Sequence, residues 1–179
     1  MSQPTTHLLA LADFNDARLD EDELWATEAS RRDSEQAPDG GVHWHWVANS
    51  NDQEITPDPS RESYVGEDAE EAVSLRSRET WPTTSGVGDL PQFALYADEV
   101  PSAVGGHIIR HDPARVLAEV AAKRVLIANW RELIQRIDAE QDAEKRERLA
   151  LTRHGMDQVA HQLAAVHANH PDYQESWRP

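Results

Sequence analysis

The sequence predicts an α+β fold with three main helices, one N-terminal and two forming a C-terminal helical hairpin, and a small antiparallel sheet from the middle region. Three observations predict it. Apolar residues recur at the helical period in one stretch near the N-terminus and in two near the C-terminus. Between them, most of the Pro and Gly residues separate short β-prone runs. The length suits one domain, residues 1–179.

The first helix is expected over residues 5–32, which contain no Pro or Gly. Thr5 or Thr6 can serve as its N-cap, because a threonine hydroxyl accepts a hydrogen bond from a free N–H of the first turn. Asn15 and Asp22 interrupt the apolar face, so we expect this helix to need a packing partner. The residues that share the face are Leu8, Leu11, Ala12, Leu19, Ala26 and Ala29.

The middle of the chain, residues 33–104, is expected to be an acidic sheet-and-loop region that is partly flexible, including some of residues 49–71. Its clearest strand is the run VHWHWVA at 42–48. Alternation places the two tryptophans of this run on one side of the strand and the two histidines on the other. Two further runs look extended, at 73–81 and 93–100, with a loop at 82–91 between them, while the pairing order stays open.

The second helix begins at a clear signal, because Asp112 followed by Pro113 is an N-cap with proline at the first helical position. Residues 105–179 are therefore expected to form a helical hairpin with a docked C-terminal tail. Tyr173 and Trp177 are the side chains available to anchor that tail. The second helix repeats its apolar residues at Val116, Val120, Ile127, Trp130, Ile134 and Ile137, broadened by Leu117, Leu126 and Leu133.

The last helix shows a similar spacing, which predicts a second packing face. The turn between the two helices is expected near residues 139–143. No Gly or Pro marks it, so one long helix kinked near Gly155 is the alternative. The expected packing face consists of Leu149, Met156, Val159, Leu163 and Val166.

The net charge of −16 is confined to one half of the chain. Residues 1–100 hold 22 Asp and Glu against 6 Lys and Arg, whereas residues 101–179 hold 11 of each. An acidic half repels phosphate backbones, so we expect no direct nucleic-acid binding. We also expect no membrane segment, because no run approaches the apolar length that a spanning helix needs. The absence of Cys fits a cytoplasmic location.

Three blocks of the sequence resemble a domain-of-unknown-function family of actinobacteria and their phages. They are ARLDEDE at 17–23, GGHIIRHDPARVLAEVAAKR at 105–124 and HPDYQESWRP at 170–179. Residues 42–104 are longer and more divergent than this resemblance leads us to expect, and His167 stands where relatives often have Tyr. The resemblance implies a small phage-associated or actinobacterial protein, and it supplies no catalytic residues.

The strongest metal-site candidates are His107, His111 and Asp112. Histidines four residues apart share one face of a helix, and a His-Asp pair is typical of metal-dependent phosphohydrolases. Two points count against a site. Pro113 puts the pair at a helix entrance, where the spacing loses its meaning if the preceding chain is a loop. An N-cap Asp112 also commits its carboxylate to backbone N–H groups. We therefore predict no metal, no cofactor and no catalytic residues.

Other motifs are weaker. His43 and His45 share a strand face, but the neighbouring tryptophans favour an aromatic-rich, half-buried strand over a chelating pair. The acidic block at 17–23 lacks the glycine and the ligand spacing of a calcium loop, which indicates a solvated helix face. No phosphate-binding loop or nucleophile elbow is present.

Three functions from different classes remain. The first is a non-enzymatic interaction or regulatory protein that binds a protein partner, with a homo-oligomer as one form that such binding can take. The second is an acidic decoy that imitates nucleic acid, which the charge split permits. The third is a metal-dependent hydrolase centred on His107, His111 and Asp112.

Overall fold

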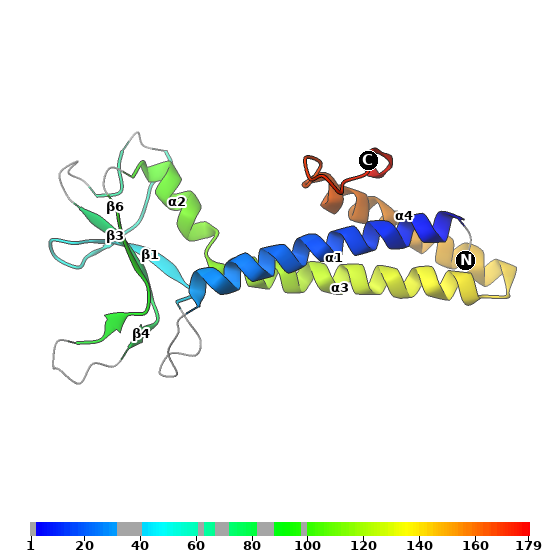
Figure 1. Cartoon of the computed structure of the whole chain (residues 1–179), viewed down its shortest axis with the longest axis horizontal. Coiled ribbons are helices and arrows are strands. Elements are labelled where there is room, and N and C mark those ends of the chain that lie inside the picture. Colours follow the sequence, from blue (N-terminus) through cyan, green and yellow to red (C-terminus); the bar gives the residue numbers. More distant parts are fainter. Residues whose placement is uncertain (1–2, 32–40, 61–62, 67–71, 82–87, 98–99) are drawn as a thin grey trace. The chain divides into compact units, whose positions relative to one another are not determined.

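The computed structural model describes residues 3–31, 41–60, 63–66, 72–81, 88–97 and 100–179. Over these residues the fold is α+β, with four α helices and a small antiparallel sheet (Figure 1). Residue contacts divide the chain into two compact units. We call Met1–Glu23 with Glu119–Pro179 the helical unit, and Leu24–Ala118 the sheet unit. That the chain folds as one domain stays a prediction.

The expectation of three main helices is wrong, because an additional helix, α2, spans Ser102–Arg110. Its sequence, SAVGGHIIR, contains two glycines, which lower helix propensity. Packing explains one of them. A Cβ on Gly105 would lie 2.4 Å from Cγ2 of Val65 and 3.1 Å from Nε1 of Trp46. The Gly105 carbonyl also accepts a hydrogen bond from Trp46 Nε1 at 3.0 Å, so α2 sits directly on the sheet.

The first helix, α1, spans Gln3–Ser30. It begins before Thr5, so the prediction that Thr5 or Thr6 caps it is wrong. The buried hydroxyl of Thr5 donates instead to Asp138 Oδ1 at 3.2 Å. Asn15 is buried rather than an interruption of the packing face, and its Nδ2 donates to the Ala160 carbonyl at 3.1 Å. Ala29 is exposed, and the predicted residues that are buried are Leu8, Leu11, Ala12, Leu19 and Ala26.

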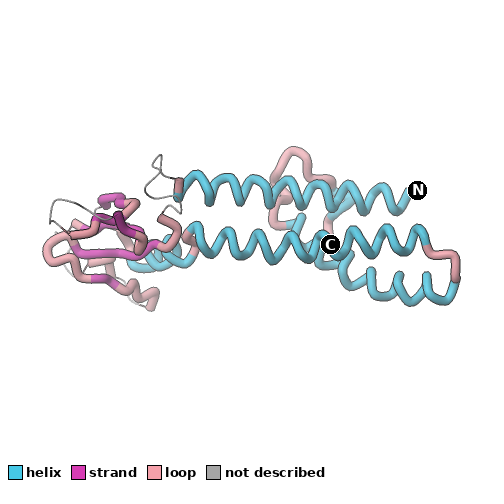
Figure 2. Tube along the Cα trace, turned by 90° about the horizontal axis from the view of Figure 1, so that it is seen from below, coloured by secondary structure: helices cyan, strands magenta, loops and turns pink. Residues whose placement is uncertain are grey.

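The helices α3 (Pro113–Ala139) and α4 (Ala143–Ala165) are joined by residues 140–142, where the sequence placed the turn. Figure 2 shows α3 and α4 running in opposite directions beside each other. The Trp130 Nε1 group on α3 donates to Asp157 Oδ1 on α4 at 2.8 Å. On α3 the predicted packing face is buried at Val120, Ile127, Trp130 and Ile134, and half-buried at Val116 and Ile137.

On α4 the predicted packing face is wrong in part. The fully buried residues are two alanines, Ala160 and Ala164, while Val159 and Val166 are 46% and 79% exposed. Apolar spacing defines a helical period without saying which small residues let two helices approach. The hydrogen bond from Asn15 to the Ala160 carbonyl shows that α1 contacts α4 at these alanines. The helical core comprises Leu8, Leu11, Ala12, Phe14, Ile127, Trp130, Ile134, Ala160, Ala164 and Trp177.

The sheet unit contains a four-stranded antiparallel sheet in the order β2-β1-β3-β6 and a separate two-stranded pair, β4-β5. Trp46 on β1 lies opposite Leu75 on β3, which lies opposite Leu95 on β6. Trp46 and Leu75 are buried together with Val65 and Val73 in a second core. The strands are β1 (Trp44–Ala48), β2 (Glu54–Ile55), β3 (Val73–Ser77), β4 (Thr80–Trp81), β5 (Leu90–Pro91) and β6 (Ala94–Ala97).

The three predicted strand runs correspond to β1, to β3 with β4, and to β6. The strands β2 and β5, each of two residues, were missed. The first lies in a polar stretch, and the second lies at the end of the run 82–91, which was expected to be a loop. Flexibility was predicted for parts of residues 33–104. Several segments of this region lie outside the described residues, namely 33–40, 61–62, 67–71, 82–87 and 98–99. Within the described part of the chain, no helix has the length and apolar character needed to span a bilayer.

Candidate functional site

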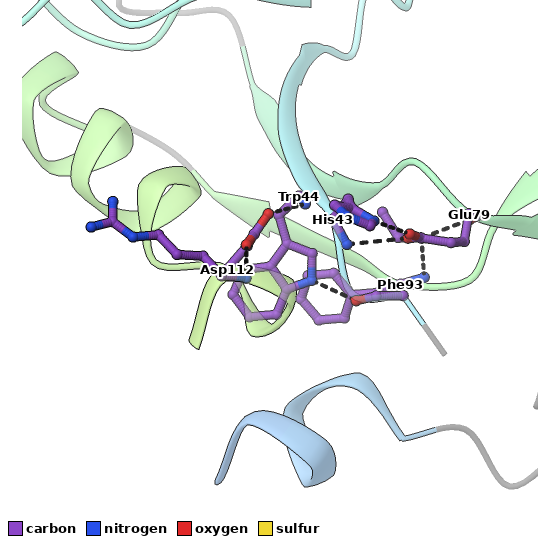
Figure 3. A network of polar contacts seen from close by, with 8 residues as sticks. His43, Trp44, Glu79, Phe93 and Asp112 are labelled. Carbon is purple, nitrogen blue, oxygen red and sulfur yellow. Dashed lines mark hydrogen bonds and ion pairs between the residues drawn. The ribbon is translucent and has the colours of Figure 1, made fainter. Parts of the chain in front are cut away.

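Asp112 is the N-cap of α3, and both of its carboxylate oxygens accept hydrogen bonds from backbone N–H groups (Figure 3). Oδ1 accepts from Arg115 N at 2.9 Å, which satisfies one free N–H of the first helical turn. Oδ2 accepts from Trp44 N at 3.4 Å, at the start of β1. The predicted capping role is therefore present, and the same carboxylate also holds the strand.

Trp44 and its neighbours extend this contact across the sheet unit. The Trp44 indole stacks on Phe93, with ring centroids 5.1 Å apart and an angle of 18° between the rings, and its Nε1 donates to the Gly41 carbonyl. Phe93 N donates to the Ser77 hydroxyl, which in turn donates to the Glu79 carbonyl. The network thus connects the α3 N-terminus with three strand segments, and it is structural in character (Figure 3).

The two histidines of the first strand run have different environments. His43 Nδ1 lies 2.6 Å from Glu79 Oε1. Burial raises the pKa of Glu79, but hydrogen bonds from His43 and from backbone N–H groups outweigh it and hold that pKa below its ordinary value. Burial, aided by Arg78, lowers the pKa of His45, so its neutral form is favoured. The strand interpretation of this run therefore fits better than a chelating pair.

His107 and His111 lie together on α2, with ring centroids 4.4 Å apart, and both residues are exposed. The sequence interpretation gave their spacing no weight for the case that a loop precedes Asp112. A helix precedes it instead, because α2 ends at Arg110 and His111 is its C-cap residue. Asp112 does not join them, since its carboxylate is bound to backbone N–H groups. Among the described residues, no group of three or more His, Asp or Glu side chains is arranged to hold a metal ion.

In the helical unit, two arginines of α3 bind four carboxylates of α1. Arg131 Nη2 lies 2.6 Å from Asp13 and 2.7 Å from Asp16. About two turns earlier on α3, Arg124 Nη2 lies 2.6 Å from both of its partners, Asp20 and Glu23. These contacts neutralise much of the acidic face of α1, so that face is not a free array of negative charges.

The C-terminal tail packs on the ring of Phe14 in α1. Trp177, in the short 3₁₀ helix η1 (Glu175–Trp177), is buried with its ring centroid 5.0 Å from that of Phe14. Tyr173 contacts the same ring edge-on at 6.0 Å. His161 Nδ1 on α4 donates to the Trp177 carbonyl at 2.7 Å. Tyr173 and Trp177 are therefore the anchors that the sequence indicated.

Arg18 is the least expected member of this cluster, because its side chain is only 8% exposed. Its guanidinium lies 5.2 Å from the centre of the Phe14 ring, and Nη2 pairs with Glu21 at 3.0 Å. Its Nε and Nη1 are buried with no hydrogen-bond partner among the described residues. Beside it lies a cavity of about 40 Å³, lined also by Asp22 and Lys123. Opposite charges balance around this cavity, which favours a few waters over an anion.

An open, partly apolar surface of the helical unit lies along α4. A hollow of about 1020 Å³ is lined there by Val159, Leu163, Val166 and Arg178. An apolar crevice of about 50 Å³ adjoins it and adds Leu126 from α3. Leu163 lines both of these spaces and the Arg18 cavity, so all three border the same side chain. We call the surface formed by Leu126, Val159, Leu163, Val166 and Arg178 the α4 groove.

Sequence reasoning missed the α4 groove because it assigned Val159 and Val166 to the core. One signal was available: Ala160 and Ala164 are four residues apart on a face about 130° from that of Val159 and Val166. Two apolar faces on one helix indicate contacts on two sides. Nothing in the sequence distinguishes Arg18 from the other charged residues of α1, so its burial could not be foreseen.

Comparison with known proteins gives one result. The model of a family of unknown function, DUF6221, matches residues 9–179. The comparison with curated proteins gave no match, and neither did the comparison with solved structures. Since the matched residues cover nearly the whole sequence and include both the α4 groove and the Asp112 network, the chain belongs to the family of unknown function DUF6221.

Proposed function

We propose that this chain is a non-enzymatic protein that binds a protein partner through the α4 groove. One observation carries the proposal: Val159 and Val166 are largely exposed beside an open hollow, while the adjacent face of α4 is buried against the core. Exposed apolar surface next to a hollow is typical of protein–protein contact sites. The partner we propose presents an apolar segment to Val159, Leu163 and Val166.

The hollow has the character expected of an interaction surface rather than an enzyme site. Its lining combines valine and leucine with glutamine, histidine and arginine, a mixture of apolar and polar side chains that is common at protein–protein interfaces. The acidic decoy has less support. Four α1 carboxylates are bound by Arg124 and Arg131, which removes them from any array that imitates phosphates. A cytoplasmic setting and a phage or actinobacterial origin belong to the same proposal.

The experiment uses a photo-crosslinking amino acid at Val166, the C-cap residue of α4, with Glu144 in the first turn of α4 as the matched control position. Both positions are highly exposed: the Glu144 side chain is 80% exposed, and Val166 as a whole residue is 79% exposed. Glu144 does not line the groove. We expect one protein to crosslink from position 166 and not from 144 in cells that produce the chain. A second copy of the chain crosslinked from 166 alone would identify the partner as the chain itself.

The purified partner is then tested against V166D. We expect its affinity to fall at least about tenfold, which corresponds to about 1.4 kcal/mol, because the substitution places a charge in an apolar contact. The melting curve should not change, since Val166 is exposed in the free protein. Equal crosslinking from both positions, or unchanged affinity in V166D, would show that the groove does not bind a partner.

A further inference from the structure

The helix α2 brings together two imidazole groups that the proposed function does not use. His107 lies in its last turn and His111 directly after it, with ring centroids 4.4 Å apart. Both residues are exposed, so an ion can reach them from solvent. Neither ring has a carboxylate as a described hydrogen-bond partner, and the nearest acidic residue in sequence, Asp112, is bound to backbone N–H groups.

We propose that His107 and His111 chelate one divalent transition-metal ion of the zinc, nickel and copper class. Imidazole nitrogens bind Zn²⁺ at about 2.0–2.1 Å, so two of them on one tetrahedral ion lie roughly 3.3 Å apart. Rings on adjacent helical turns with centroids 4.4 Å apart reach that separation by small rotations of the side chains. Nitrogen ligands select this class of ion over Mg²⁺ and Ca²⁺, which prefer oxygen.

Such a site has two protein ligands and leaves two positions for water or for a group of another molecule. It therefore differs from the three-residue hydrolase centre that the sequence raised, since Asp112 takes no part in it. It is also independent of the α4 groove, so each proposal can fail without the other.

The test is a zinc titration of the full chain, purified without a polyhistidine tag, against a chromophoric zinc indicator. We expect one zinc per chain for the wild type. H107A and H111A should each weaken binding at least about tenfold, because each leaves a single imidazole. H154A is the matched control: His154 is also an exposed helical histidine, but its ring is paired with Gln158 at 3.4 Å.

A second variant separates spacing from the number of histidines. In V104H with H107A, the two histidines lie seven residues apart, roughly 10.5 Å along the helix, which is too far to share an ion. Val104 is 49% exposed, so the fold should persist, as checked by circular dichroism. This variant should bind zinc as weakly as H107A. Wild-type affinity in H107A or in the spacing variant, or no stoichiometric zinc on the wild type, would overturn the proposal.

Discussion

Helices α3 and α4 share one kind of apolar spacing but use it differently. On α3 the large residues of the repeat, among them Ile127 and Trp130, are 2% and 1% exposed. On α4 the core contacts are made by Ala160 and Ala164, and the valines of the repeat face outward. A helical repeat therefore identifies a helix and an apolar stripe, but the size of the residues beside the stripe decides which side meets the core.

The largest effect should come from placing a charge on the buried stripe of α3. I127D buries an unpaired carboxylate and should cost roughly 4 kcal/mol or more, enough to abolish cooperative thermal unfolding. A thermal melt of I127D followed by circular dichroism tests whether cooperative unfolding is lost. The matched change at the end of α4, V166D, should leave the melting temperature unchanged. If both variants lowered the melting temperature by a similar amount, the two apolar stripes would be equally buried.

A larger side chain on the alanine face of α4 should have the next effect. A164L adds volume at a position with no exposed surface and should cost about 1–3 kcal/mol through overpacking. V159L, one helical face away, should change the free energy of unfolding by less than about 0.5 kcal/mol. Chemical denaturation of both variants gives the comparison, and a stabilised A164L would show that α1 and α4 are not in close contact there.

The two helices also differ at their caps. Asp142 caps α4 by accepting from Lys145 N at 3.0 Å, whereas Asp112 caps α3 and also accepts from Trp44 N. D142A should cost about 0.5–1 kcal/mol, and D112A about 1–2 kcal/mol because the strand contact is lost as well. Urea denaturation measures the loss of unfolding free energy in each variant. Equal losses in D142A and D112A would contradict this prediction.

The smallest effect concerns pH and His167, just beyond the end of α4. Burial lowers the pKa of His167 below its ordinary 6.5; Asp22 opposes this shift, while Arg18 and Lys123 add to it. The unfolded chain then binds this proton more readily, so folding becomes less favourable as the pH falls through 6.5. H167Q should flatten this part of the stability profile, measured by urea denaturation between about pH 5 and 7.5. An identical slope in both proteins would assign the loss to other groups.

Much of the fold follows from local signals in the sequence. The Asp-Pro start of α3, the turn at 140–142 and the β-prone run that forms β1 each depend on residues close together in the chain. The helix α2 was missed because its two glycines oppose helix formation locally, and the contact that explains the first of them, between Gly105 and Trp46, joins residues 59 positions apart. Long-range packing of this kind overrides local propensity.

The candidate sites were less accessible to sequence reasoning for the same reason. The capping role of Asp112 is local and was predicted, while its bond to Trp44 spans 68 residues and was not. The α4 groove depends on which face of α4 meets α1, and the proximity of His107 to His111 depends on α2. Each of these features is set by tertiary contacts, which apolar periodicity does not encode.

The double use of Asp112 has a consequence for local opening of the structure. Because its two oxygens bind the Arg115 and Trp44 amides, the first turn of α3 cannot fray by rotating this carboxylate away without also releasing the first amide of β1. The amide hydrogens of these two residues should then exchange with deuterium in a single shared event rather than at separate rates. A helix end and a strand end, ordinarily the first parts of a protein to loosen, are joined here into one cooperative element.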